Sequence, residues 1–207
     1  MNEKLSKEDG SEQADERVYR QIVGSLLYLT ATRPDIMFAA SLLARFMHEP
    51  TRKHMGTAKR VLRYIQGTFD YGIVYEKGKE ARLIGYCDSD WSGSEDDMRS
   101  TSGYAFNLGS GVFSSSKVGA TTILCDNTFA IAITKNLVHH HKTRHINRRF
   151  HFIRDALQNR EIDLLYCKTE EQITDIFTKA LAKDQFEYLR RKLGVISAKH
   201  LEGSVEL

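Results

Sequence analysis

The chain has 207 residues, which is long enough for one large domain or two small domains with a buried core. It carries 30 Lys and Arg residues against 27 Asp and Glu residues, so its formal charge of +3 indicates no particular class of partner. The polar start predicts no signal peptide, and no apolar run approaches the ~18 residues that a membrane span needs. We therefore expect no membrane partner.

Residues 1–15 are polar and charged and predict a disordered lead. Three amphipathic helical patterns follow between residues 16 and 68. The first begins at Glu16, the second begins around Pro34, which a first helical turn tolerates, and the third ends at Gly67. Their apolar stripes are Tyr19, Ile22, Val23, Leu26 and Leu27; Ile36, Ala39, Ala40, Leu43, Phe46 and Met47; and Met55, Ala58, Val61, Leu62 and Ile65.

The third helical pattern has a basic face opposite its apolar stripe. Lys59 and Arg63 lie on this face, together with Lys53 and Arg60. Such side chains can displace counterions from nucleic-acid phosphates, or they can form an ordinary solvated helix face. Both interpretations stay open on the pattern alone.

Strand patterns begin after residue 68. A turn signal, Gly109-Ser110-Gly111, predicts that two of them form a hairpin, and the first four form an antiparallel meander. Later strands alternate with helical patterns, so the fold class is mixed α/β, and the end is polar from Ser197. The expected strands are 69–75, 82–88, 102–108, 111–115, 121–126 and 162–167, and the expected helices are 128–136, 172–181 and 186–193.

Three cysteines, Cys87, Cys125 and Cys167, lack the CxxC spacing of zinc and redox motifs. This pattern is typical of free, buried thiols in a reducing compartment. We therefore expect an intracellular protein of the cytoplasm or nucleus.

Three aspartates follow or interrupt apolar patterns that lie far apart in the sequence. Asp88 follows the strand pattern Ile84-Gly85-Tyr86-Cys87, Asp126 follows the strand that ends at Cys125, and Asp175 lies in a helical pattern. An acidic strand end often opens a solvated turn. The alternative is a metal site, because hard cations need oxygen ligands on rigid elements. Three such carboxylates together indicate an Mg²⁺ cluster.

Several motifs occur in a fixed order: YCDSDWSG at 86–93, the run Arg99–Tyr104, LCDN at 124–127, KTRHINRRFHFIR at 142–154 and TDIFTKAL at 174–181. Together they resemble the ribonuclease H domain of copia-type LTR retrotransposon Pol polyproteins. The stretches 19–35 and 54–75 resemble the C-terminal end of that family's reverse transcriptase. The resemblance covers about residues 17–194. It implies a ribonuclease H-like mixed sheet with flanking helices at 69–195, a small helical thumb or connection region at 16–68, and a tail at 196–207.

The family's ribonuclease H site holds Mg²⁺ with four carboxylates, Asp-Glu-Asp-Asp, and hydrolyses the RNA strand of RNA–DNA hybrids. By resemblance, Asp88, Asp126 and Asp175 match three of these catalytic and metal-binding positions. The family's Glu lies on a long helix before the CDN strand, but here only Gly119-Ala120 stands between the strand patterns, which is too short for a helix. The resemblance therefore implies an incomplete two-metal Mg²⁺ site and impaired activity. No Tyr-x-Asp-Asp motif occurs, so we expect no polymerase activity.

The stretch His139–Arg154 contains five Lys or Arg and five His residues. It predicts either contact with nucleic acid or a solvated basic helix, and His141 and His145, four residues apart, leave a zinc alternative. Asn127 is either a helix cap or a contact to the hybrid, and Trp91 either covers a core edge or stacks on a base. The residues expected at an RNA–DNA hybrid are Arg99, Asn127, Arg144, Arg148, Lys59 and Arg63.

Three functional classes stay open. The first is an active ribonuclease H whose site is completed by Glu95 or Asp97. The second is a nucleic-acid-binding module without catalysis, and the third is a decayed fragment with no selected role. Metal titration separates the first from the second, and salt-dependent binding to a hybrid separates the second from the third.

Overall fold

The structure is a computed structural model with a mixed α/β fold, as the sequence predicts. Its chain divides into two compact units, each described here by itself: a helical unit of Met1–Val74, Ser89–Thr101 and Asp175–Leu207, and a sheet unit of Tyr75–Asp88 and Ser102–Thr174. The residues that it describes are 5–7, 9–75, 83–90, 101–107, 120–135, 153 and 155–200.

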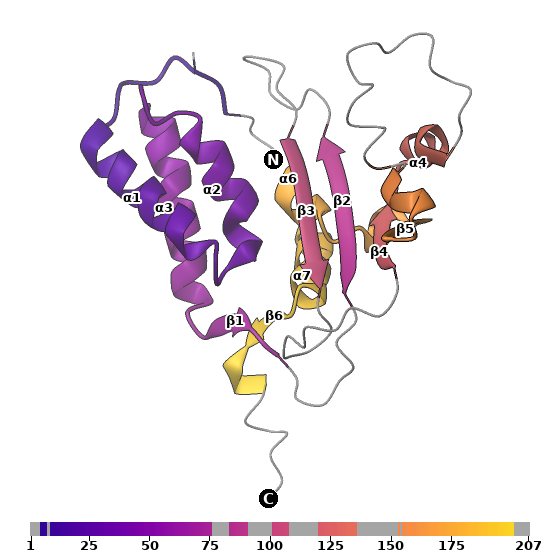
Figure 1. Ribbon diagram of the computed structural model, residues 1–207. Coiled ribbons are helices and arrows are strands. Elements are labelled where there is room, and N and C mark those ends of the chain that lie inside the picture. The colour runs from indigo at the N-terminus through magenta and orange to yellow at the C-terminus, as the bar shows by residue number, and fades with distance from the viewer. Residues whose placement is uncertain are drawn as a thin grey trace, which may run out of the picture. The chain divides into compact units, whose positions relative to one another are not determined.

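The helical unit begins with the three expected helical patterns (Figure 1). They form α1 (Glu16–Leu29), a 3₁₀ turn η1 (Pro34–Ile36) that continues into α2 (Met37–Ala44), and α3 (Arg52–Gly67). The Asp15 carboxylate caps α1 by accepting from the Val18 N–H at 2.9 Å. Within the stretches that the structure describes, no helix is both long enough and apolar enough to cross a membrane.

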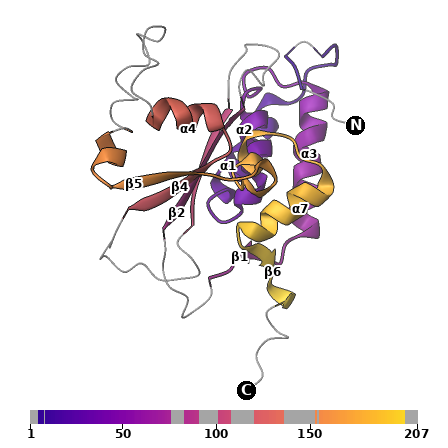
Figure 2. The ribbon, with the colours of Figure 1, turned by 90° about the vertical axis from the view of Figure 1, so that its right-hand side faces the viewer.

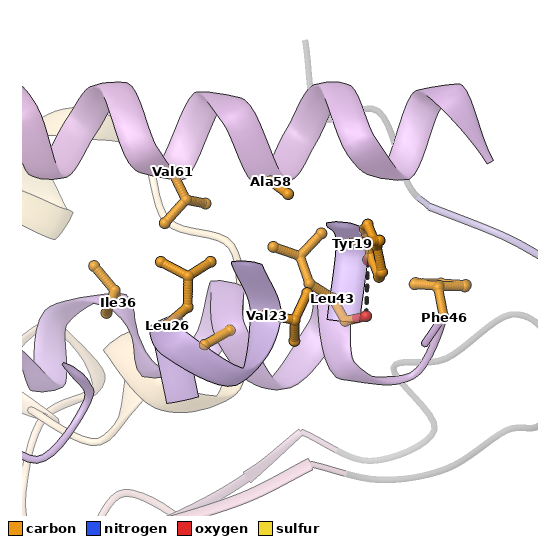
Figure 3. Packing of buried hydrophobic residues seen from close by; sticks show 9 residues of the cluster. Tyr19, Val23, Leu26, Ile36, Leu43, Phe46, Ala58 and Val61 are labelled. Atoms are coloured by element: carbon orange, nitrogen blue, oxygen red, sulfur yellow. Dashed lines mark hydrogen bonds between the residues drawn. The ribbon is translucent and has the colours of Figure 1, made fainter. Parts of the chain in front are cut away.

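The core of the helical unit lies between α1, α2 and α3, and Figure 3 shows their apolar side chains facing one another. The Tyr19 hydroxyl donates to the Leu43 carbonyl at 2.9 Å, which satisfies the single polar atom of this cluster's tyrosine, and burial raises its pKa. The helical periods therefore identified most of the core face, but the predicted stripe residues Leu27 and Leu62 are exposed, because they lie at the edges of their stripes. The buried members of the cluster are Tyr19, Val23, Leu26, Ile36, Ala40, Leu43, Phe46, Ala58 and Val61.

The lead segment at residues 9–15 is paired with the start of α3, which differs from the disordered lead expected at 1–15. The Ala14 N–H donates to the Pro50 carbonyl and the Arg52 N–H donates to the Glu12 carbonyl, both at 2.8 Å. The Thr51 hydroxyl donates to Asp9 Oδ2 at 2.7 Å. Polar composition missed this contact because backbone hydrogen bonds between distant segments do not depend on an apolar period.

The strand expected at 69–75 forms β1 (Tyr71–Ile73), but it does not join the main sheet. It pairs antiparallel with β6 (Val195–Ser197), with Tyr71 opposite Ser197. The predicted meander is therefore wrong at its first strand, and the residues expected as a tail from 196 begin inside β6 and continue into η4 (Ala198–His200). The helical unit also contains α6 (Asp175–Thr178) and α7 (Lys183–Lys192).

A buried polar network joins η1, α3 and α7 inside the helical unit. Arg33 and Asp35, 4% and 3% exposed, form a bidentate ion pair with nitrogen–oxygen distances of 2.9 and 2.8 Å. The Tyr64 hydroxyl donates to Asp35 Oδ2 at 2.6 Å and accepts from Arg190 Nη1 at 3.0 Å. The Arg190 guanidinium also lies 4.4 Å from the centre of the Tyr71 ring.

The sheet unit holds a four-stranded mixed sheet in the order β3-β2-β4-β5. Strand β4 runs parallel to both of its neighbours, while Figure 1 shows β3 and β2 running in opposite directions. Helix α4 (Thr128–Lys135) follows β4 and lies against β5 (Figure 2). The strand expected at 111–115 lies outside the described residues. The strands are β2 (Ile84–Asp90), β3 (Thr101–Asn107), β4 (Thr121–Cys125) and β5 (Ile162–Tyr166).

Candidate metal centre

Two of the three aspartates stand at the carboxyl ends of neighbouring strands. Strands β2 and β4 are parallel, and their register places Cys87 opposite Cys125. Asp88 is the next residue in β2, two residues before this strand ends, and Asp126 directly follows β4. Both aspartates therefore lie toward the same end of the two strands, and both are half-buried. After β4 ends at Cys125, the chain turns and α4 begins at Thr128.

The third aspartate, Asp175, is the first residue of α6 and is 4% exposed. It follows Thr174, the last residue of the sheet unit, by one peptide bond. Just before it, the fully buried Gln172 donates from Nε2 to the Cys87 carbonyl at 3.0 Å and accepts the Thr174 hydroxyl on Oε1 at 2.8 Å. This side chain anchors the segment that leads into Asp175 to the strand that carries Asp88.

The three carboxylates form one acidic group. One oxygen from each of Asp88, Asp126 and Asp175 lies within 4.8 Å of the other two. A set of three carboxylate oxygens suits a hard divalent cation such as Mg²⁺ or Mn²⁺ and does not suit a soft one. This group could therefore hold a metal ion.

Lys179 contributes a positive charge to the acidic group. Its Nζ lies 3.0 Å from Asp175 Oδ1, one helical turn further along the chain. An ammonium at this distance offsets part of the repulsion between buried carboxylates. It also occupies an oxygen that a cation would need, so metal binding at Asp175 has to compete with this ion pair.

A pair of thiols lies beside the carboxylates. The Cys87 thiol donates to the Leu124 carbonyl at 3.8 Å. The interaction between the two neighbouring thiols lowers the pKa of Cys125 and raises the pKa of Cys87, which burial raises further. None of the three cysteines is in a disulfide, as expected; Cys125 and Cys167 are buried, whereas Cys87 is only half-buried.

The remaining predicted residues divide into three groups. Asn127 is a helix cap, because its Oδ1 accepts from the Ala130 N–H at 3.0 Å. Lys59 and Arg63 are exposed on α3, as the predicted basic face requires. The others lie outside the described residues: Arg99, Arg144, Arg148, Trp91, Glu95, Asp97, His141 and His145.

Sequence reasoning missed Gln172 and Lys179 as parts of this site. Gln172 acts through a carbonyl that lies 85 positions earlier in the chain, and no local pattern reports such a contact. Lys179 had a usable signal, because it stands four residues after Asp175, the spacing at which helical side chains of opposite charge meet.

Comparisons with known proteins place the chain among transposon polyproteins. The retrovirus-related Pol polyproteins from transposons RE2 and RE1 of Arabidopsis thaliana are each 36% identical to it over 93% of its length. The corresponding polyprotein from transposon TNT 1-94 of Nicotiana tabacum is 28% identical over 86%. The chain spans only 16% of the length of each of these relatives. No family model and no solved structure matches it.

The aligned lengths show that the chain is shorter inside the matched region than its relatives. The alignment with the RE2 polyprotein extends over 232 positions, whereas 93% of 207 residues is about 193, which leaves about 39 positions without a counterpart. The TNT 1-94 alignment extends over 218 positions, whereas 86% of 207 residues is about 178, which leaves about 40. A shortfall of this size is large enough to contain a helix.

Proposed function

Because this chain belongs to the copia-type retrotransposon Pol polyproteins, of which it spans a part, we propose that it is a remnant of such a polyprotein with an impaired ribonuclease H-like portion. Residues 16–68 then derive from the thumb or connection end of the reverse transcriptase. Residues 69–195 derive from the ribonuclease H domain without one core helix. The ancestral activity in this proposal is Mg²⁺-dependent hydrolysis of the RNA strand of RNA–DNA hybrids.

The observation that carries the proposal is the acidic group of Asp88, Asp126 and Asp175. These residues would hold Mg²⁺, and a bound ion of this kind polarises the phosphodiester and activates the attacking water. Asp88 and Asp126 supply ligands from rigid strand ends, and Gln172 fixes the approach of the chain to Asp175. The protein thus contributes three ligands on a preorganised frame.

We expect impaired ribonuclease H activity because the family's fourth carboxylate ligand has no match in this sequence. The family's fourth carboxylate is carried by a helix, and the strand pattern before Gly119-Ala120 leaves no room for that helix in this sequence. The shortfall of about 40 aligned positions supports the same conclusion. Two divalent ions share four carboxylates in the family, and Mg²⁺ demands near-ideal octahedral geometry, so three carboxylates favour one ion over two.

A cleavage assay tests this proposal. The substrate is an RNA–DNA hybrid with Mg²⁺, and the variants are Asp88→Asn and the matched control Asp163→Asn, whose carboxylate is exposed on β5. We expect the wild-type chain to give no more cleavage than Asp88→Asn. Cleavage that is lost in Asp88→Asn but retained in Asp163→Asn would show an active enzyme, with Glu95 or Asp97 as candidates for the fourth carboxylate.

The second candidate is a nucleic-acid-binding module without catalysis. It is favoured by the exposed basic side chains Lys59, Arg60 and Arg63 on α3, which stand on the face opposite the buried Ala58 and Val61. Cations on a regular helix face can track a phosphate backbone. In this candidate, as in the first, the partner is an RNA–DNA hybrid, with Asn127, Arg99, Arg144 and Arg148 as further contacts.

Salt dependence of hybrid binding separates the module from a decayed fragment. A module loses affinity linearly in the logarithm of salt concentration, and each phosphate contact removed by Lys59→Ala or Arg63→Ala lowers that slope by about 1. Arg17→Ala, on the exposed face of α1, is the matched control and leaves the slope unchanged. A decayed fragment shows no such dependence in any variant. Free cysteines support an intracellular location, in the cytoplasm or nucleus.

A further inference from the structure

An open groove of about 520 Å³ lies on the helical unit, where residues 13–15 meet the starts of α1 and α3. Ala14, Val18 and Met55 contribute apolar side chains to its lining, and Gly56 lines it without a side chain. Val18 is 42% exposed, so part of this apolar lining is in contact with water. The volume of the groove is within the range of ligand-binding sites in proteins.

Gly56 gives the groove part of its space. It lies inside α3, where glycine is less favourable than alanine because it loses more conformational freedom on folding. Its φ is not positive, so the backbone does not require a glycine here. A Cβ placed on Gly56 would meet no heavy atom within 4 Å, so internal packing does not require one either. The surface of α3 at this position is therefore open to a group from outside the chain.

Positive charge borders the apolar lining. Arg52 and Lys59 line the groove from α3, two helical turns apart and on one face of the helix. The first turn of α3 has no acidic residue that would offset the positive end of the helix dipole. The lining contains one carboxylate, Asp15, which caps α1. Arg52 pairs with Glu12 at 2.8 Å, but these side chains are 73% and 74% exposed, so a partner's carboxylate can replace Glu12 in this weak ion pair.

The wall of the groove at residues 13 and 14 is fixed by backbone pairing. Gln13 forms a β-bridge with Thr51, and the Ala14 N–H donates to the Pro50 carbonyl at 2.8 Å. A wall that is ordered before binding lowers the entropy that a partner loses when it docks.

We propose that this groove binds an acidic peptide segment of a partner protein. The segment places one bulky apolar side chain over Gly56, and its flanking carboxylates pair with Arg52 and Lys59. A peptide fits better than a nucleic acid, because the exposed lining is mainly apolar and because the Asp15 carboxylate repels phosphates. This inference does not depend on the ribonuclease ancestry. Lys59 could serve either kind of partner, so the experiment has to separate them.

Selection from a library of random short peptides, displayed on phage, tests the proposal on the full-length chain. We expect the selected peptides to share one bulky apolar residue flanked by acidic residues. The tightest of them is labelled with fluorescein and titrated by fluorescence polarisation. Its affinity should fall at least about tenfold in Gly56→Trp, which fills the groove, and in Lys59→Glu, which reverses one charge. The matched control is Gly24→Trp, because Gly24 is also exposed inside a helix with open surroundings but does not line the groove.

Far-UV circular dichroism verifies the fold of each variant, and Lys59→Glu gives the result alone if Gly56→Trp does not fold. Asp88→Asn should bind the peptide as the wild type does, so this outcome is independent of the metal centre. A selection that yields no peptide, or only peptides that bind Gly56→Trp and Lys59→Glu as they bind the wild type, would overturn the proposal. An RNA–DNA hybrid or a second copy of the chain that occupies the groove in place of the peptide, with binding lost in Gly56→Trp, would overturn it as well.

Discussion

Replacing Tyr64 by Phe removes one hydroxyl from the buried network of the helical unit and leaves the ring in place. That hydroxyl donates to Asp35 at 2.6 Å and accepts from Arg190 at 3.0 Å. Asp35 keeps its two hydrogen bonds from Arg33, so its carboxylate stays satisfied after the substitution. Arg190 instead loses the hydrogen bond that its Nη1 donates to Tyr64. This loss is costly because Arg190 is only 8% exposed and its Nε already has no hydrogen-bond partner among the described residues.

The magnitude follows from these contacts. A hydrogen bond to a charged group contributes about 1.5–3 kcal/mol, and leaving a buried charged donor unpaired adds to that loss. We therefore expect Tyr64→Phe to lower the free energy of unfolding by about 2–4 kcal/mol. The matched control is Tyr28→Phe, because Tyr28 is 88% exposed in the same unit, and its expected effect is within about 0.5 kcal/mol.

Urea unfolding followed by far-UV circular dichroism measures both variants. A second substitution, Arg190→Met, removes the charge that Tyr64→Phe leaves unpaired. The double variant should therefore be less destabilised than the sum of the two single variants. A loss for Tyr64→Phe no larger than that of Tyr28→Phe, or strict additivity with Arg190→Met, would refute this reasoning.

Burial, with the hydrogen bond to Asp35, raises the pKa of Tyr64 to about 12. The contribution of Tyr64 to the free energy of unfolding is therefore complete below pH 10 and is lost as the pH rises through about 12. In Tyr64→Phe, the free energy of unfolding should fall less steeply with pH in that window. Hydrogen bonds from Ser11 and Thr51 lower the pKa of Asp9 to about 2. The contribution of Asp9 to the free energy of unfolding is therefore complete above pH 3.8 and is lost as the pH falls toward 2. In Asp9→Asn, the free energy of unfolding should fall less steeply as the pH is lowered. Gln172→Met leaves the Cys87 carbonyl without this donor and should cost about 1–3 kcal/mol in urea unfolding, with weaker Mn²⁺ binding although all three aspartates remain.

The helices and the candidate aspartates could be predicted from the sequence, each for a different physical reason. Helices α1 and α3 bury one stripe each, and a stripe at a period of 3.6 residues is visible in any single sequence. Asp88 and Asp126 directly follow cysteines that end apolar strand patterns, and parallel strands bring such ends together. Asp175 was grouped with them because it interrupts an amphipathic helical pattern, and the family resemblance then matched all three to metal-binding positions.

Long-range pairing was not accessible in the same way. Strand β1 has three residues and pairs with β6, more than 120 residues later in the chain, and alternation inside a strand says nothing about its partner. Helix α6 was expected to span the period around Ile173–Leu181 but covers only Asp175–Thr178. All four of its residues are buried, and burial on every side leaves no amphipathic contrast from which a length could be read.

Mn²⁺ binding to the purified chain tests the central claim most directly, because this paramagnetic ion reports its own binding without turnover. The account predicts one Mn²⁺ per chain, displaced by Mg²⁺, with affinity falling by at least about tenfold in Asp88→Asn, in Asp126→Asn and in Asp175→Asn. The exposed carboxylate of Asp163 is the control, and Asp163→Asn should bind as the wild type does. Equal binding by the wild type and all three site variants would contradict the account, because the three aspartates would then not hold the ion.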